Sequence, residues 1–121
     1  RQVQVCGGAI ALVTGDLALN KTVSLFKVPN NFTVVRADIY VTDMDSNGTP
    51  AIAFSIGDAG SAARIVSAST AAQAGGAATT VVTLPYYQFT GGETEILWTT
   101  TTAAATAVAG TVYISLYGYV D

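Results

Sequence analysis

The chain has 121 residues, of which 50% are hydrophobic and only 11% charged, with a net charge of −3 and no histidine. The lack of histidine removes the commonest general base and the usual partner of a catalytic nucleophile. The five basic residues are scattered along the chain, so the sequence favours a surface-covering protein over an enzyme or a nucleic-acid-binding protein.

The length predicts one domain, residues 1–121, whose core is large enough to need no metal, cofactor or disulfide. The single cysteine, Cys6, is expected to pack as a small apolar side chain. No apolar run reaches the ~18 residues of a membrane helix, so no membrane partner is expected. Free surfaces usually have about 25–35% charged residues. We therefore expect part of this surface to be covered by another protein.

A period of two dominates the chain and predicts strands with one buried face. In chain order, the expected strands are Val3–Val5, Ala9–Val13, Thr22–Val28, Thr33–Asp43, Ala51–Ile56, Thr79–Leu84, Glu95–Thr101 and Val112–Val120. Glycine and asparagine pairs predict turns between them, among them Gly7-Gly8, Asn47-Gly48 and Gly75-Gly76. Ser61–Ala74 is the one departure, and its alanines favour a short helix or an irregular excursion. The expected fold class is all-β, an antiparallel β-sandwich of jelly-roll type with at most one short helix.

Two of these segments alternate clearly enough to assign faces. In the first, the residues expected to share the apolar face are Val35, Ala37, Ile39 and Val41, opposite Val34, Arg36, Asp38, Tyr40 and Thr42. In the last strand, the apolar row is Val112, Ile114, Leu116, Gly118 and Val120, opposite Tyr113, Ser115, Tyr117 and Tyr119.

The tyrosines are the candidate interface residues, because tyrosine offers rigid amphipathic area and is enriched where proteins meet. The candidates are Tyr113, Tyr117 and Tyr119 of the last strand together with Tyr86 and Tyr87 after Pro85. The alternative is that the last strand is central and that both of its faces are buried between layers.

The segment Asp43-Met44-Asp45-Ser46-Asn47-Gly48 matches the opening of a calcium loop, in which oxygen ligands alternate before a glycine turn. Position twelve of such a loop is a glutamate, but here it is Phe54, and the flanks read as strands rather than helices. The pattern therefore favours a polar inter-strand loop, with calcium binding by Asp43, Asp45 and Asn47 as the alternative.

Several features together resemble the capsid decoration, or cement, proteins of tailed bacteriophages. They are the Thr/Val/Ala-rich strands, the Gly-Gly turns, the low charge, Phe54–Asp58 followed by Arg64-Ile65-Val66, the Ala-rich Ser67–Gly76 and the tyrosine-rich last strand. The resemblance implies a non-enzymatic β-sandwich on the outer capsid surface of the virion. There it would bind the major capsid protein, often as a homo-oligomer, with a trimer favoured, and clamp neighbouring capsid subunits. It supplies no catalytic residues.

Two other functions suit the same sequence. A carbohydrate- or receptor-binding sandwich of a phage fibre or tail would use exposed tyrosines and acidic loops. A self-assembling fibre or surface-layer subunit would use the same low charge for contacts between copies.

Overall fold

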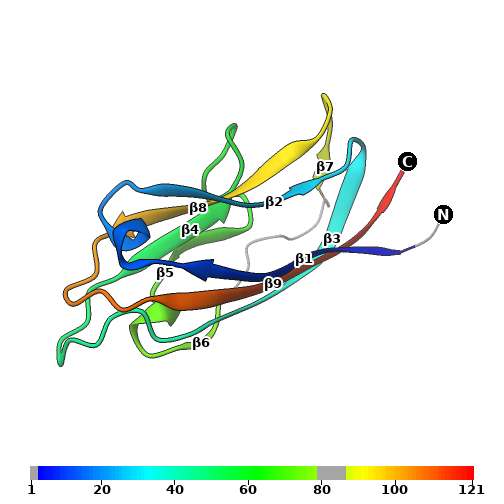
Figure 1. The fold of residues 1–121 in the computed structure, drawn as a ribbon. Coiled ribbons are helices and arrows are strands. Elements are labelled where there is room, and N and C mark those ends of the chain that lie inside the picture. Colours follow the sequence, from blue (N-terminus) through cyan, green and yellow to red (C-terminus); the bar gives the residue numbers. More distant parts are fainter. Residues whose placement is uncertain (1–2, 79–86) are drawn as a thin grey trace.

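The computed structural model describes residues 3–78 and 87–121, which form two antiparallel β-sheets packed against each other (Figure 1). Sheet A has the strand order β1-β9-β3-β6, and β7 also pairs with β3. Its strands are β1 (Gln4–Leu12), β3 (Phe32–Val41), β6 (Gly76–Ala77), β7 (Tyr87–Phe89) and β9 (Gly110–Val120). Sheet B has the order β2-β8-β4-β5. Its strands are β2 (Thr22–Val28), β4 (Ala53–Gly57), β5 (Val66–Ser69) and β8 (Thr94–Thr102). The expected all-β sandwich is confirmed.

The helical content of the described residues is two 3-10 turns, η1 (Thr14–Leu17) and η2 (Ala71–Gln73). The second lies in the segment Ser61–Ala74 that the sequence singled out, and that segment also contributes the edge strand β5. None of the described helices is long and apolar enough to cross a membrane.

The core lies between the sheets and is centred on aromatic side chains. Trp98 of β8 is fully buried and stacks on Phe54 of β4, with ring centroids 4.1 Å apart and planes 8° from parallel. The indole N–H of Trp98 donates to the Thr100 hydroxyl at 2.9 Å, and that hydroxyl donates to the Asp16 carbonyl at 2.8 Å. The one polar atom of the tryptophan is thus satisfied inside the core, and the same hydroxyl fixes turn η1 to sheet B.

The prediction of a turn at Gly7-Gly8 is wrong. Both glycines lie inside one continuous strand, β1, which pairs with β9 over nine residues without a register shift. Their φ angles of 140° and 153° are open to glycine but strained for other residues. A Cβ on Gly7 would collide with the backbone carbonyl of Ile114. Gly7 therefore allows close contact between β1 and β9, and the glycine pair does not reverse the chain.

The face assignment for the first alternating segment is correct only in part. Ala37, Ile39 and Val41 are buried as expected, but a bulge in β3 between Val34 and Arg36 leaves Val35 half-buried and turns Val34 into the core. Such a bulge inserts one extra residue and so reverses the alternation on one side of it. In β9 the predicted alternation holds along the whole strand, since Val112, Ile114, Leu116 and Gly118 are buried.

Cys6 of β1 is half-buried and packs against the core, and this burial raises the pKa of its thiol. It fits the sequence expectation of a small apolar residue. The strand expected at Thr79–Leu84 lies outside the described residues.

Candidate protein interface

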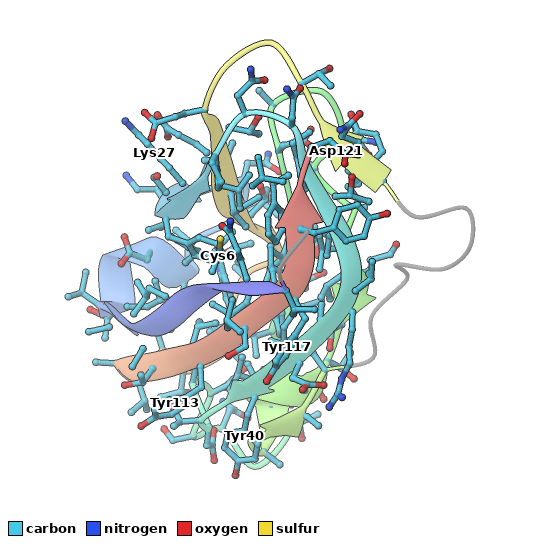
Figure 2. All side chains as sticks on the ribbon, turned by 90° about the vertical axis from the view of Figure 1, so that its right-hand side faces the viewer. Cys6, Lys27, Tyr40, Tyr113, Tyr117 and Asp121 are labelled. Atoms are coloured by element: carbon cyan, nitrogen blue, oxygen red, sulfur yellow. The ribbon has the colours of Figure 1, made fainter. Side chains whose placement is uncertain are left out.

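The last strand places three of the predicted interface tyrosines on the outer side of sheet A. β9 lies between β1 and β3, so it is a central strand, as the alternative interpretation supposed. Its outer side is nevertheless open: Tyr113 is 49% exposed, and Tyr117 and Tyr119 are half-buried. Figure 2 shows Tyr113 and Tyr117 along this strand. Because residues alternate along a strand, the buried row of β9 fixes the direction of all three tyrosines.

A fourth tyrosine, which is not among the predicted interface residues, joins them from the neighbouring strand. Tyr40 of β3 pairs directly with Tyr113, is 52% exposed, and its ring centroid lies 6.4 Å from that of Tyr113 at an interplanar angle of 55°. Directly opposed residues of an antiparallel pair share one face. The signal was present in the alternation of Thr33–Asp43, but strand pairing could not be read from one sequence.

On the other side of β9, strand β1 extends this surface with small apolar residues. Val5 pairs with Tyr117 and Ala9 pairs with Tyr113, and both side chains are exposed. Val3 precedes the strand and is 71% exposed. We call the outer surface of sheet A formed by Tyr40, Tyr113, Tyr117, Tyr119, Val5 and Ala9 the tyrosine face.

The only ion pair found on this face among the described residues is internal to it. The guanidinium of Arg36 contacts the Asp38 carboxylate at 2.7 Å and lies 5.1 Å from the centre of the Tyr117 ring. The hydrogen bond to Asp38 is the main reason that the pKa of Arg36 is raised. The two charges cancel, so the tyrosine face has little net charge of its own.

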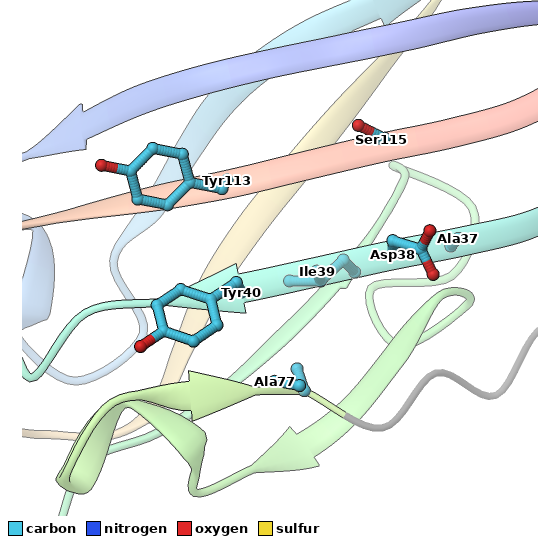
Figure 3. Close-up of a pocket in the computed structure, with 8 residues that line it drawn as sticks. Ala37, Asp38, Ile39, Tyr40, Ala77, Tyr113 and Ser115 are labelled. Carbon is cyan, nitrogen blue, oxygen red and sulfur yellow. The ribbon is translucent and has the colours of Figure 1, made fainter.

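A hollow of about 370 Å³ opens at one end of the tyrosine face (Figure 3). Tyr40 and Tyr113 form one side of it, and Asp38 and Ser115 form the other. Ala77 of β6 closes it at the edge of the sheet.

Tyr87 lies apart from the tyrosine face, and Tyr86 lies outside the described residues. Tyr87 pairs with the inward-facing Val34, so it points to the inner side of sheet A at its edge. Its ring contacts Phe89 edge-on at 4.9 Å, and the guanidinium of Arg64 stacks on it at 3.8 Å. Among the predicted tyrosines that the structure describes, Tyr87 therefore does not share a surface with Tyr113, Tyr117 and Tyr119.

Arg64 is held in this position by a buried carboxylate. Its Nε donates to Asp58 at 2.6 Å, and Asp58 also accepts backbone N–H groups from Gly60 and Ser61 at 2.8 Å. Burial raises the pKa of Asp58, but the bonds from Arg64 and the backbone outweigh it, and the pKa is lowered. Because Arg64 also stacks on Tyr87, the Asp58–Arg64 pair links the loop after β4 to strand β7.

The acidic loop 43–48 is organised by Asp45, which is 1% exposed. Its two oxygens accept backbone N–H groups of Asn47, Ala51, Ile52, Ala105 and Thr106 at 2.8–3.3 Å. Burial raises the pKa of Asp45, but these bonds outweigh it and hold the pKa well below its usual range.

Asp43 and Asn47 likewise accept backbone N–H groups within the loop, from Asp45 at 3.0 Å and from Thr49 at 2.8 Å. Among the described residues, no group of three His, Cys, Asp or Glu side chains could hold a metal ion. The geometry supports the favoured interpretation of a polar inter-strand loop, in which Asp45 joins two chain crossings between the sheets.

The outer surface of sheet B has a different composition. Along β8 its outward residues include Glu95, Thr99 and Thr101, and β2 adds the exposed Lys27, which pairs with Glu95. We call Lys27, Glu95, Leu97, Thr99 and Thr101 the threonine face. It has no aromatic residue among these positions.

Comparison with solved structures identifies the class of protein. A chain in the capsid asymmetric unit of cyanophage Pam1 has 31% sequence identity to this chain and a TM-score of 0.78, over 98% of this chain and 85% of that one. The chain therefore belongs to the same family as this Pam1 capsid chain, and it is a phage capsid-associated β-sandwich protein. This family membership supports a structural role in the virion.

Two further capsids contain chains of the same fold. One is the capsid of Ralstonia phage GP4, with a TM-score of 0.84 and 22% identity over 99% of this chain and 85% of that one. The other is the acid-stable capsid of Helicobacter pylori bacteriophage KHP30, with a TM-score of 0.53 and 13% identity over 98% and 94%. No protein-family model and no curated protein sequence matches the chain.

Proposed function

We propose that the protein is a non-enzymatic cement protein that binds the outer surface of a phage capsid through the tyrosine face and stabilises contacts between capsid subunits. The observation that carries the proposal is the exposed aromatic surface of sheet A in a chain of a capsid family. A row of half-exposed tyrosines beside exposed valines is the composition of a protein interface rather than of a free surface.

The partner in this proposal is the major capsid protein. Each copy contributes a modest interface, and many copies on one shell convert these contacts into resistance of the whole particle to heat. A homotrimer remains our expectation for the bound form, because the resemblance to cement proteins implies it.

Binding to capsid shells from which the protein has been removed tests the proposal. The double variant Tyr113→Ala, Tyr117→Ala should bind these shells at least about 30-fold more weakly, which corresponds to about 2 kcal/mol. The shells loaded with this variant should lose the added heat resistance. The matched control is Thr99→Ala, Thr101→Ala on the threonine face, which should bind as the unchanged protein does. Equal binding by both double variants would contradict the proposal.

A further inference from the structure

The hollow at the end of the tyrosine face has a defined chemistry that follows from strand register. Tyr40 pairs with Tyr113, and Asp38 pairs with Ser115, so these four residues occupy adjacent positions on one face of two neighbouring strands. Figure 3 shows the two tyrosine rings next to each other, with the Asp38 carboxylate and the Ser115 hydroxyl further along the same strands. The hollow therefore combines two aromatic rings, one carboxylate and one hydroxyl, and apolar residues, mostly alanines, complete its lining.

A guanidinium group suits these walls better than other side-chain chemistries do. It is planar and stacks on aromatic rings, and it has five N–H donors for carboxylate and hydroxyl oxygens. An acidic side chain would meet the Asp38 carboxylate without a free cation to receive it, because Arg36 is already bound to Asp38. An apolar side chain would cover the carboxylate and the hydroxyl without bonding to either.

The molecule itself contains the same combination at another place. The Arg64 guanidinium is bonded to Asp58 at 2.6 Å and stacked on Tyr87 at 3.8 Å. In the hollow, Asp38 corresponds to that carboxylate and Tyr40 and Tyr113 to that ring. The volume of about 370 Å³ leaves room for one long side chain.

We propose that this hollow receives an arginine side chain of the protein partner that docks on the tyrosine face. The inference rests on the proposed function for the identity of the partner, but the recognition of arginine is a property of this chain alone. Arg36 competes with the incoming arginine, because it occupies part of the same carboxylate. Both Arg36 and Asp38 are largely exposed, with side-chain exposures of 67% and 50%, so their pairing is weak and yields at little cost.

The first experiment is a titration of protein with ¹³C-labelled tyrosine rings, followed by NMR, with Nα-acetyl-arginine amide as the probe. Saturable shifts of the Tyr40 and Tyr113 rings are expected. The neutral isostere Nα-acetyl-citrulline amide should give none, since it lacks the positive charge. Equal shifts with both probes, or no saturable shift at either ring, would overturn the assignment of the hollow.

Two variants should change the affinity for the arginine probe in opposite directions. Asp38→Asn should weaken it about threefold, because the carboxylate charge is removed. Arg36→Gln should strengthen it by a similar factor, because the competing cation is removed. The indole N–H resonance of the buried Trp98 checks that both variants remain folded. A change in the same direction in both variants would overturn the role given to Asp38.

Shell binding separates this inference from the proposed function. Asp38→Asn should also weaken binding to depleted shells about threefold or more. If Asp38→Asn binds shells normally while the tyrosine variants do not, the arginine inference fails and the proposed function stands. If the tyrosine variants bind shells normally, the proposed function fails, whatever the arginine titration shows.

Discussion

The two outer surfaces of the sandwich are both formed by antiparallel strands, yet they have opposite compositions. The tyrosine face of sheet A presents Tyr40 and Tyr113 at about half exposure beside uncharged β1. The threonine face of sheet B presents Lys27, Glu95 and threonines. Since both sheets bury their inner sides in one core, folding does not require this difference. Of these two outer surfaces, the tyrosine face therefore has the large exposed apolar side chains, and we expect the partner there.

The edges of the two sheets differ as well. β1 is the outer strand of sheet A in the described structure and runs nine residues without charge, proline or bulge. β2, at the edge of sheet B, has Lys27 and a bulge between Ser24 and Phe26, and β5 at the other edge has four residues. Charges, bulges and short length protect sheet edges from unwanted pairing. The less protected edge therefore lies beside the tyrosine face.

The largest effect is expected from a charge placed on the tyrosine face. Tyr113→Lys should weaken binding to depleted shells at least about 100-fold, because it removes an aromatic contact and buries an unpaired cation in the interface. Thr101→Lys adds the same charge to the threonine face and should change binding less than about twofold. Affinity for the shells, measured by co-sedimentation, checks both, and similar losses would show that the two faces do not differ in function.

A substitution in the central strand β9 tests how far the stability of sheet A depends on close packing of β9 against β3. Gly118 of β9 lies against β3, where a Cβ would collide with the Thr33 carbonyl and the Phe32 ring. Gly118→Ala should lower the free energy of unfolding by about 1–3 kcal/mol, as overpacking of a filled core does. Urea unfolding followed by Trp98 fluorescence measures it. Gly48→Ala is the control, since nothing lies within 4 Å of a Cβ there, and it should change stability much less.

Replacing Asp45 should lower the stability of the sandwich but should not change shell binding through the tyrosine face. Asp45→Asn should lower the Tm at pH 7 by about 10 °C, because an amide cannot accept all the buried N–H groups that the carboxylate accepts. At a temperature where the variant is folded, its shell binding should equal that of the unchanged protein. Loss of binding by the folded variant would show that the loop takes part in docking.

The pH dependence of stability follows from the same carboxylate. The pKa of Asp45 is lower in the folded than in the unfolded protein. The stabilisation that Asp45 contributes is therefore fully present at pH values above the pKa of an unfolded aspartate, about 3.9. It should decrease as the pH falls below that value towards the folded pKa. Asp45→Asn should show a shallower decrease between about pH 4 and pH 2. Thermal unfolding across this range measures both slopes, and parallel slopes would contradict the role of Asp45.

The smallest effect is expected from salt. Since Arg36 and Asp38 neutralise each other on the tyrosine face, shell binding should fall less than about fivefold between 50 and 500 mM NaCl. A steep salt dependence would show that docking uses the charged threonine face instead. Repeating the series with Arg36→Gln exposes the Asp38 charge and should make the dependence on salt steeper.

The accuracy with which the sequence predicts a strand and its buried side differs from strand to strand. In β9, uninterrupted alternation and β-branched residues fix both the strand and its buried side. In β3 the same type of pattern gives the wrong side for Val34, because a bulge is a property of two paired strands and leaves no local mark. The glycine pair in β1 has the composition of a turn, and only the pairing of β1 with β9 makes it part of a strand.

The sequence by itself determined the all-β class, the high apolar content with low charge, and the outward direction of Tyr113, Tyr117 and Tyr119, because these depend on composition and on a period of two. Only the tertiary structure decided that Tyr40 joins them and that Tyr87 stacks with Arg64 instead. It also decided that the Asp45 carboxylate accepts hydrogen bonds from backbone N–H groups. Each of these contacts joins residues that are brought together by strand order and register, which local sequence does not encode.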